Sequence, residues 1–218
     1  EFFDTSMRQE LHAYVKMGVK KDGTIVALKH QLYWDVGASA EYGSNVVNAT
    51  GFSAIGPYRI PNVWIDSFAI YTNRPPCGAY RGFGYSEFHF GLESHMDRVA
   101  KALGMDPVEF RKKNAIKEGD TVAYGVEMGP TGLQQCIDEV AKAIEWGKPS
   151  EQPKESYKVR AKGFAAVWKA PAMPANESSS AFIKFSEDGS INILVSGMEL
   201  GQGFMTTMAK IAAEELSL

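Results

Sequence analysis

Hydrophobic and polar residues alternate along two pairs of neighbouring stretches. The first pair covers 11–20 and 24–33, with Lys21-Asp22-Gly23 between them, and the second covers 181–186 and 190–196 around another Asp-Gly. Alternation with a period of two is typical of a half-buried strand, and Asp-Gly between two such runs favours a tight turn. The pattern therefore predicts two antiparallel hairpins.

Elsewhere the hydrophobic residues recur at the spacing of a helix. Phe90, Val99 and Leu103 follow that spacing, and Gly104 comes next, where it favours the end of a helix. Asp106-Pro107 then predicts a new helix, because an Asp side chain caps the first turn and proline suits the first helical position. Helical spacing and end signals predict helices at 87–103, 107–114, 133–146 and 204–216, and one short helix within 36–56. Further strands are predicted at 63–71 and 163–168.

The order of these elements predicts the fold class. Hairpins and helices are mixed without a regular strand–helix alternation, which favours an α+β fold with mixed or antiparallel sheets over a doubly wound parallel sheet. Residues 148–158 are polar and contain two prolines, so we predict a linker there. It would join a first subdomain at 1–147 to the start of a second at 159–218.

Composition narrows the class of protein. Of 218 residues, 44% are hydrophobic and 22% are charged, as in an ordinary packed protein, and two cysteines are too few to staple the fold. We therefore expect a reducing compartment, the cytoplasm. The net charge of −3 gives no electrostatic reason to bind nucleic acid, and no apolar run is long enough to predict a membrane helix. The sequence starts without Met and ends within a helical pattern, so we expect an excerpt of a longer chain.

Side chains that commonly ligate metals are spread along the chain. They are His12, His30, His89, His95, Cys77 and Cys136. None of them shows the spacing of a zinc site, so we predict no direct metal ligand and interpret the histidines as ordinary core or surface residues. Cys77 lies close to Arg81, which could lower the pKa of a thiol, but a buried and inert cysteine is the favoured interpretation.

Two glycine-rich segments carry the candidate chemistry. The first, Gly78-Ala79-Tyr80-Arg81-Gly82-Phe83-Gly84, joins a predicted strand to a predicted helix, and we call it the Arg81 loop. Its backbone N–H groups and the Arg81 guanidinium suit an anion, and Phe83 could stack on a flat ligand. The alternative is a plain glycine-rich turn with the arginine in an ion pair and the phenylalanine in the core.

The second segment follows the last predicted strand and opens the last predicted helix. It is Gly197-Met198-Glu199-Leu200-Gly201-Gln202-Gly203-Phe204, the Gln202 loop. Gly201 and Gly203 free the backbone around an amide that can donate and accept hydrogen bonds, and the helix start suits an anion. It lacks the dinucleotide-binding pattern and a Walker lysine, and an ordinary strand–helix turn is the alternative.

Several stretches resemble one known family when they are taken in order. They are 19–28, 35–38, 58–62, Tyr80-Arg81-Gly82-Phe83-Gly84, 93–114, 117–120 and Gly201-Gln202-Gly203. Together they are similar to the molybdenum-cofactor-binding subunit of the xanthine dehydrogenase and aldehyde oxidase family, the molybdenum hydroxylases. The resemblance covers nearly the whole chain. It implies that the two predicted subdomains are a first molybdopterin-binding subdomain and the start of a second.

The family resemblance also implies roles for particular residues. Arg81 and Gly82 would lie against the molybdopterin cofactor, Phe83 would contact the substrate, and Gln202 with Gly201 and Gly203 would bind the cofactor. The molybdenum would be held by the sulfurs of the pterin and by no protein side chain. The glutamate that serves the family as catalytic base lies downstream of Leu218, so we expect no catalytic residue in this chain and an inactive fragment.

The reaction implied by the resemblance is oxidation of an aromatic heterocycle or an aldehyde, with water as the source of oxygen. Electrons would pass to [2Fe-2S] clusters and FAD on partner subunits or domains, and the complete enzyme would be an oligomer. Two other functions stay open. The chain could be a scaffold or assembly module of the same fold that has lost the cofactor, or the two loops could bind a different phosphate ligand.

Overall fold

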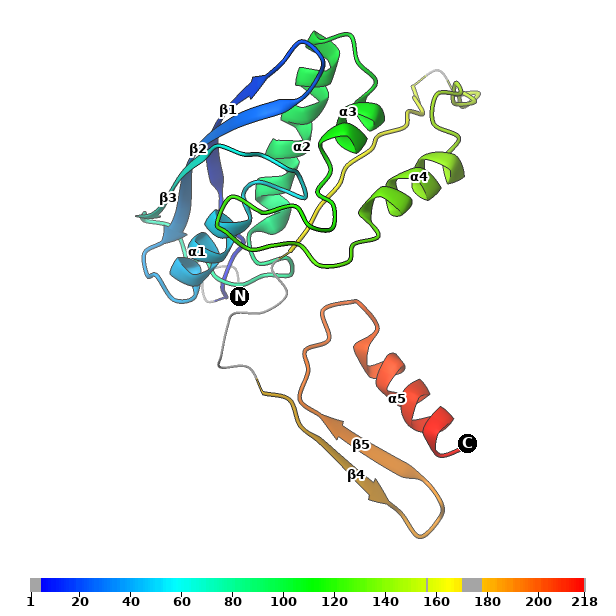
Figure 1. The fold of residues 1–218 in the computed structure, drawn as a ribbon. Coiled ribbons are helices and arrows are strands. Elements are labelled where there is room, and N and C mark those ends of the chain that lie inside the picture. The colour runs from blue at the N-terminus through cyan, green and yellow to red at the C-terminus, as the bar shows by residue number, and fades with distance from the viewer. Residues whose placement is uncertain (1–4, 156, 170–177, 218) are drawn as a thin grey trace. The chain divides into compact units, whose positions relative to one another are not determined.

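The computed structural model describes residues 5–155, 157–169 and 178–217, which belong to two compact units (Figure 1). The division falls after residue 170. The expected linker at 148–158 therefore does not separate the units, because the chain beyond it still packs on the first one. Ala166 is buried in the main core, and the Trp168 indole Nε1 donates a hydrogen bond to the carbonyl oxygen of Ser53 (3.0 Å).

The first unit is built on a three-stranded mixed sheet. Its strands are β1 (Leu11–Val19), β2 (Ile25–Gly37) and β3 (Val63–Tyr71), in the order β1-β2-β3. The β1–β2 hairpin is antiparallel as predicted, whereas β3 runs parallel to β2. A parallel neighbour requires a crossover connection, and α1 (Gly43–Ser53) lies within it.

Three further helices complete the first unit. They are α2 (Tyr85–Ala102), α3 (Pro107–Asn114) and α4 (Leu133–Ala143). The predicted cap of α3 is confirmed, because the Asp106 carboxylate accepts hydrogen bonds from the backbone N–H groups of Val108 and Glu109. The predicted strand at 163–168 is wrong. That segment is extended, but its backbone has no strand beside it, and the N–H of Ala166 bonds instead to the Glu93 carboxylate (2.9 Å).

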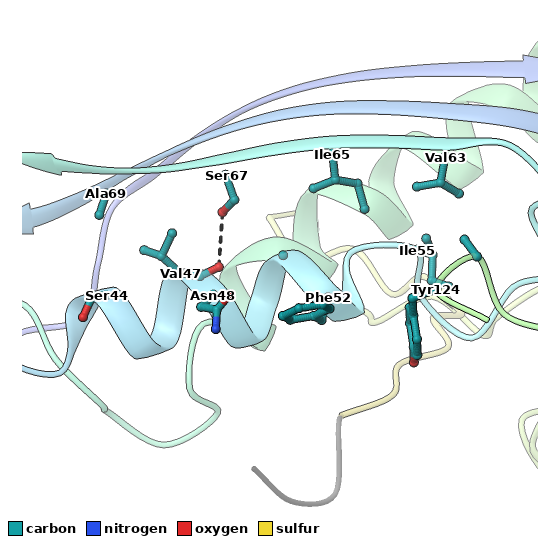
Figure 2. A pocket seen from close by; sticks show the side chains of 12 residues that line it. Ser44, Val47, Asn48, Phe52, Ile55, Val63, Ile65, Ser67, Ala69 and Tyr124 are labelled. Carbon is teal, nitrogen blue, oxygen red and sulfur yellow. Dashed lines mark hydrogen bonds between the residues drawn. The ribbon is translucent and has the colours of Figure 1, made fainter. Parts of the chain in front are cut away.

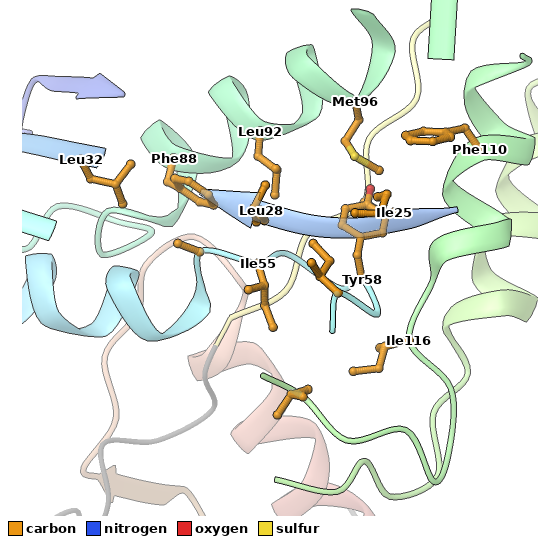
Figure 3. Packing of buried hydrophobic residues seen from close by; sticks show 14 of the residues in the cluster. Ile25, Leu28, Leu32, Ile55, Tyr58, Phe88, Leu92, Met96, Phe110 and Ile116 are labelled. Atoms are coloured by element: carbon orange, nitrogen blue, oxygen red, sulfur yellow. The ribbon is translucent and has the colours of Figure 1, made fainter. Parts of the chain in front are cut away.

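The main core lies between the sheet and α2 (Figure 3). Side chains from one face of β2, including Leu28 and Leu32, meet Phe88, Leu92 and Met96 from α2. These residues are 2% exposed or less, so they are removed from water almost completely. Burial of this kind stabilises by about 25 cal/mol per Å² of apolar surface, so the sheet–α2 contact contributes strongly to the stability of the first unit.

A buried ion pair crosses the same core. Arg111 of α3 is completely buried, and its Nε donates to the Glu93 carboxylate of α2 (2.7 Å). The same carboxylate accepts a hydrogen bond from the Tyr58 hydroxyl (2.7 Å), and Arg111 also donates to Asp97 (2.7 Å). Burial and the neighbouring carboxylate raise the pKa of Tyr58, so its hydroxyl stays protonated and keeps donating. One carboxylate thus joins α2, α3, the chain after α1 and the segment at Ala166.

The second unit contains a hairpin and one helix. These are β4 (Ala181–Phe185), β5 (Ile191–Val195) and α5 (Phe204–Glu215), and the antiparallel hairpin around Asp-Gly is confirmed. No described side chain of this unit is buried, although Phe182, Phe185 and Leu194 are large and apolar. Within the described residues of both units, no helix has the length and apolar character needed to cross a membrane.

Replacing Arg111 tests the buried network. Arg111→Met should lower the free energy of unfolding by about 3–5 kcal/mol, because it leaves the Glu93 charge buried without its cation. Lys148→Met is the control, since Lys148 is 70% exposed and pairs only with Glu145 at the surface. Urea denaturation of the purified variants measures both. Equal midpoints for the two variants would contradict the central role of the pair.

Candidate functional site

The Arg81 loop has an unusual backbone. It connects β3 to α2, and four successive residues have positive φ angles: Arg81 at 23°, Gly82 at 106°, Phe83 at 53° and Gly84 at 83°. Glycine adopts such angles freely, but they cost an arginine or a phenylalanine about 1–3 kcal/mol each. Strain of this kind persists only where surrounding contacts hold it, and it is common at binding sites.

Gly84 fixes the loop to α1. A Cβ atom at this position would come within 2.5 Å of the Thr50 hydroxyl and within 2.7 Å of Val46, so only glycine allows the approach. The Thr50 hydroxyl donates to the carbonyl oxygen of Val46 within α1 (2.7 Å), and it also lies 3.4 Å from the carbonyl oxygen of Phe83, a long contact. Gly84 is also the residue directly before α2, so the loop is held between two helices.

The last four residues of the loop, 81–84, have hydrogen-bond donors without a partner among the described residues. Within the described part of the chain, neither the backbone N–H groups of Arg81, Gly82, Phe83 and Gly84 nor the Arg81 guanidinium has a hydrogen-bond or ion-pair partner. Arg81 is exposed, so the alternative that its side chain is consumed in an ion pair does not hold in this structure. A strained backbone with unpaired donors and one forked cation is suited to hold an anionic or oxygen-rich ligand.

Phe83 is half-buried beside a second aromatic ring. Its ring centroid lies 5.9 Å from that of Tyr42 at an interplanar angle of 69°, an edge-to-face contact. Tyr42 precedes α1 and is 54% exposed. Sequence analysis did not single out Tyr42, because the two rings are 41 positions apart and only the fold brings them together.

The Gln202 loop is folded on itself. A Cβ atom at Gly197 would come within 2.3 Å of the Phe204 ring, so the two ends of the loop touch. The Gln202 amide oxygen accepts from the N–H of Leu200 (2.7 Å), and its nitrogen donates to the carbonyl oxygen of Met198 (2.7 Å). One hydrogen of that nitrogen is left for a ligand, because an amide group has two.

Glu199 accepts hydrogen bonds from the backbone N–H groups that were expected to bind an anion. Its carboxylate accepts from the N–H groups of Gly201 (2.7 Å), Gly203 (3.1 Å) and Met205 (3.3 Å) at the start of α5. These hydrogen bonds lower the pKa of Glu199, so it is charged and caps the helix. A bound anion at this helix start would have to displace Glu199, which leaves the Gln202 amide as the better contact of this loop.

Cys77 and His30 are both buried. Burial raises the pKa of the Cys77 thiol, which favours an inert cysteine. His30 lies in the core with its ring edge-on to Phe88 (5.2 Å), and burial lowers its pKa to about 4, so the ring is neutral at pH 7. Across the ranges that the structure describes, no group of three or more His, Cys, Asp or Glu side chains could hold a metal ion.

An apolar groove between α1 and β3 was not predicted from the sequence (Figure 2). Its volume is about 590 Å³, and its lining includes Phe52, Asn48, Ile65 and Tyr124. The alternation within 63–71 identifies which β3 side chains face α1, but nothing in the sequence places α1 beside that strand. The lining contains neither Arg81 nor Phe83, so the groove is a separate feature.

Two stretches of the chain match models of known protein families. Residues 1–115 match a family model described as a molybdopterin cofactor-binding domain, and residues 139–218 match a second model with the same description. The chain is 31% identical to the xanthine dehydrogenase molybdenum-binding subunit of Escherichia coli O157:H7, over all of this chain and 30% of that protein. It is 38% identical to the nicotinate dehydrogenase large molybdopterin subunit of Eubacterium barkeri, over 65% of this chain and 34% of that protein.

A solved structure has the same fold. The aldehyde oxidoreductase from Desulfovibrio gigas superposes with a TM-score of 0.61 and 33% identity, covering 64% of this chain and 15% of that protein. The α+β prediction is therefore confirmed. The chain spans only 28% to 34% of the length of three curated relatives that it matches.

Gly84 offers a direct test of the loop geometry. Gly84→Ala should lower the free energy of unfolding by about 2 kcal/mol or more, because the new methyl group meets Thr50 and the φ angle of 83° is unfavourable for alanine. Gly91→Ala is the matched control. It lies within α2 with nothing within 4 Å, so alanine should be neutral or stabilising by about 1 kcal/mol. Denaturant unfolding measures both, and equal effects would show that Gly84 is not constrained.

Proposed function

The chain belongs to the molybdopterin cofactor-binding family, and on that premise we propose that it supplies two loops to the cofactor site of a molybdenum hydroxylase. The observation that carries the proposal is the set of unpaired donors on the Arg81 loop. These donors fit a cofactor rich in oxygen and nitrogen acceptors. The Arg81 loop lies within the first matched stretch and the Gln202 loop within the second, so each matched part contributes one loop.

Each loop has a separate task in this proposal. Arg81 and the N–H of Gly82 bind the cofactor from the first unit, and the free amide hydrogen of Gln202 binds it from the second, where Gly201 and Gly203 allow close approach. When bound, the molybdenum cofactor supplies a two-electron oxidation in which the added oxygen comes from water. The general base is a glutamate beyond Leu218, so the 218 residues alone are inactive.

The substrate class follows from Phe83. The Phe83 ring, in edge contact with Tyr42, offers an aromatic surface two residues from Arg81 in the sequence, which supports an aromatic heterocycle or an aldehyde as substrate. Two relatives support this class by name, since one is a nicotinate dehydrogenase subunit and another is an aldehyde oxidoreductase.

We also propose that the complete enzyme passes electrons to [2Fe-2S] clusters and FAD on partner subunits or domains. Several relatives are named as subunits, which supports an assembly of more than one chain. The second unit exposes Phe182, Phe185 and Leu194, and these apolar side chains support packing against further protein.

Replacing Arg81 tests cofactor binding. Arg81→Met should reduce the molybdenum content of the purified complete enzyme about tenfold, because a charge-assisted hydrogen bond is worth about 1.5–3 kcal/mol. Arg59→Met is the control, since Arg59 is half exposed and forms only a long surface pair with Asp120 (3.6 Å). Metal analysis gives the readout. Full molybdenum content in Arg81→Met would contradict the role of the loop, and a wild-type enzyme without molybdenum would favour a scaffold.

Phe83 separates substrate classes. In the complete enzyme, Phe83→Ala should lower kcat/KM for benzaldehyde about three- to tenfold more than for acetaldehyde, because only an aromatic substrate gains from a ring contact. Phe90→Ala is the control, since Phe90 is 79% exposed on α2. Steady-state kinetics with an artificial electron acceptor compares the variants. Equal losses for the two aldehydes would exclude a ring contact with the substrate.

A further inference from the structure

We propose that Arg8 is a positioning residue that holds the Arg81 loop in its binding conformation. The inference rests on the proposed function, because it concerns the loop that carries the cofactor contacts. Arg8 itself contacts no ligand in this proposal. It acts through the backbone from which Arg81 and Phe83 project.

One guanidinium contacts both the loop and the first turn of α2 that follows it. Arg8 Nη2 donates to the carbonyl oxygen of Arg81 (3.0 Å), and Nη1 donates to the Ser86 hydroxyl (2.6 Å) and the Glu87 carboxylate (3.0 Å). Its Cζ atom also lies 5.0 Å from the centroid of the Tyr80 ring, a cation–π contact. The contacts therefore enclose the strained residues 81–84 from both sides.

Arg8 projects from a fixed backbone. The N–H of Met7 donates to the carbonyl oxygen of Pro76, and the N–H of Gly78 donates to the carbonyl oxygen of Met7, both at 3.1 Å. Two residues after Arg8, the carbonyl oxygen of Glu10 accepts from the N–H of Asp35 on β2 (3.0 Å). Because the chain is anchored before and after Arg8, the guanidinium holds the loop at a fixed position relative to the sheet.

The loop needs such a contact because it makes few of its own. Its four successive positive φ angles are unfavourable for Arg81 and Phe83, and its own N–H groups at 81–84 have no partner within the described residues. The carbonyl oxygens of Gly82 and Gly84 accept from the N–H groups of Tyr85 and Phe88 in α2, and that of Phe83 has a long contact with the Thr50 hydroxyl (3.4 Å). Arg8 supplies the hydrogen bond at the remaining carbonyl oxygen, that of Arg81, the residue whose guanidinium the loop presents.

The forked geometry excludes a simple charge effect. The two terminal nitrogens of Arg8 reach acceptors on different residues while Cζ lies over the Tyr80 ring, and a lysine offers only a single point charge. We therefore expect that Arg8→Lys does not restore the behaviour of the wild type, although it keeps the charge next to Glu87.

Amide hydrogen exchange of the complete enzyme tests the positioning role. The amides of Tyr85 and Phe88 donate to the carbonyl oxygens of Gly82 and Gly84, so they report on the order of the loop. In Arg8→Met and Arg8→Lys their exchange should accelerate about tenfold, while the amides of β2 exchange as in the wild type. Arg59→Met, the control for losing a surface arginine, should leave all of them unchanged.

Two results would overturn the inference. Unchanged exchange at Tyr85 and Phe88 in Arg8→Met would show that Arg8 does not hold the loop. Acceleration at β2 as well would show a general loss of stability instead of positioning. In the same samples, Arg8→Met should lower the molybdenum content, as Arg81→Met does. If exchange accelerates but neither variant loses molybdenum, the Arg8 contact stands and the proposed cofactor role of the loop fails.

Discussion

The buried pair between Arg111 and Glu93 is the constraint on which the rest of the first unit depends. A buried carboxylate is tolerated only when its charge and its lone pairs are satisfied, and Glu93 is satisfied by Arg111, Tyr58 and the N–H of Ala166. Those partners come from three segments that are far apart in the sequence. Each partner supports the others, and together they tie the middle of α2 to α3, to the chain after α1 and to the segment at Ala166.

The first turn of α2 is where this rigidity becomes useful. Gly84 stands directly before the helix, so any movement of α2 would move the Arg81 loop with it. The loop has unfavourable backbone angles, and such angles persist only where the surrounding structure holds them. The close approach of Gly84 to Thr50 and the Arg8 contacts tie the loop to the scaffold from two further directions. Several packing and hydrogen-bond contacts thus converge on one short segment that can hold a ligand.

The sequence was a good guide to local structure. Both Asp-Gly hairpins, the capped start of α3 and the helical spacing in α2 depend on neighbouring residues, so they could be predicted. The two candidate loops were also found, because glycine clusters beside Arg81 and Gln202 are visible in the sequence. Long-range contacts were not visible. The parallel pairing of β3, the partners of Glu93, the Tyr42–Phe83 contact and Arg8 all depend on the fold. The supposed strand at 163–168 failed for the same reason, since its hydrogen bonds go to a side chain and not to a strand.

A structure of the complete enzyme with its cofactor bound tests the central claim most directly. The account predicts that the Arg81 guanidinium and the Gln202 amide lie within about 3.5 Å of polar atoms of the same molybdopterin, with the Phe83 ring facing the open side of the site. A structure in which the two side chains contact separate groups, or in which the cofactor lies away from the Arg81 loop, would contradict it.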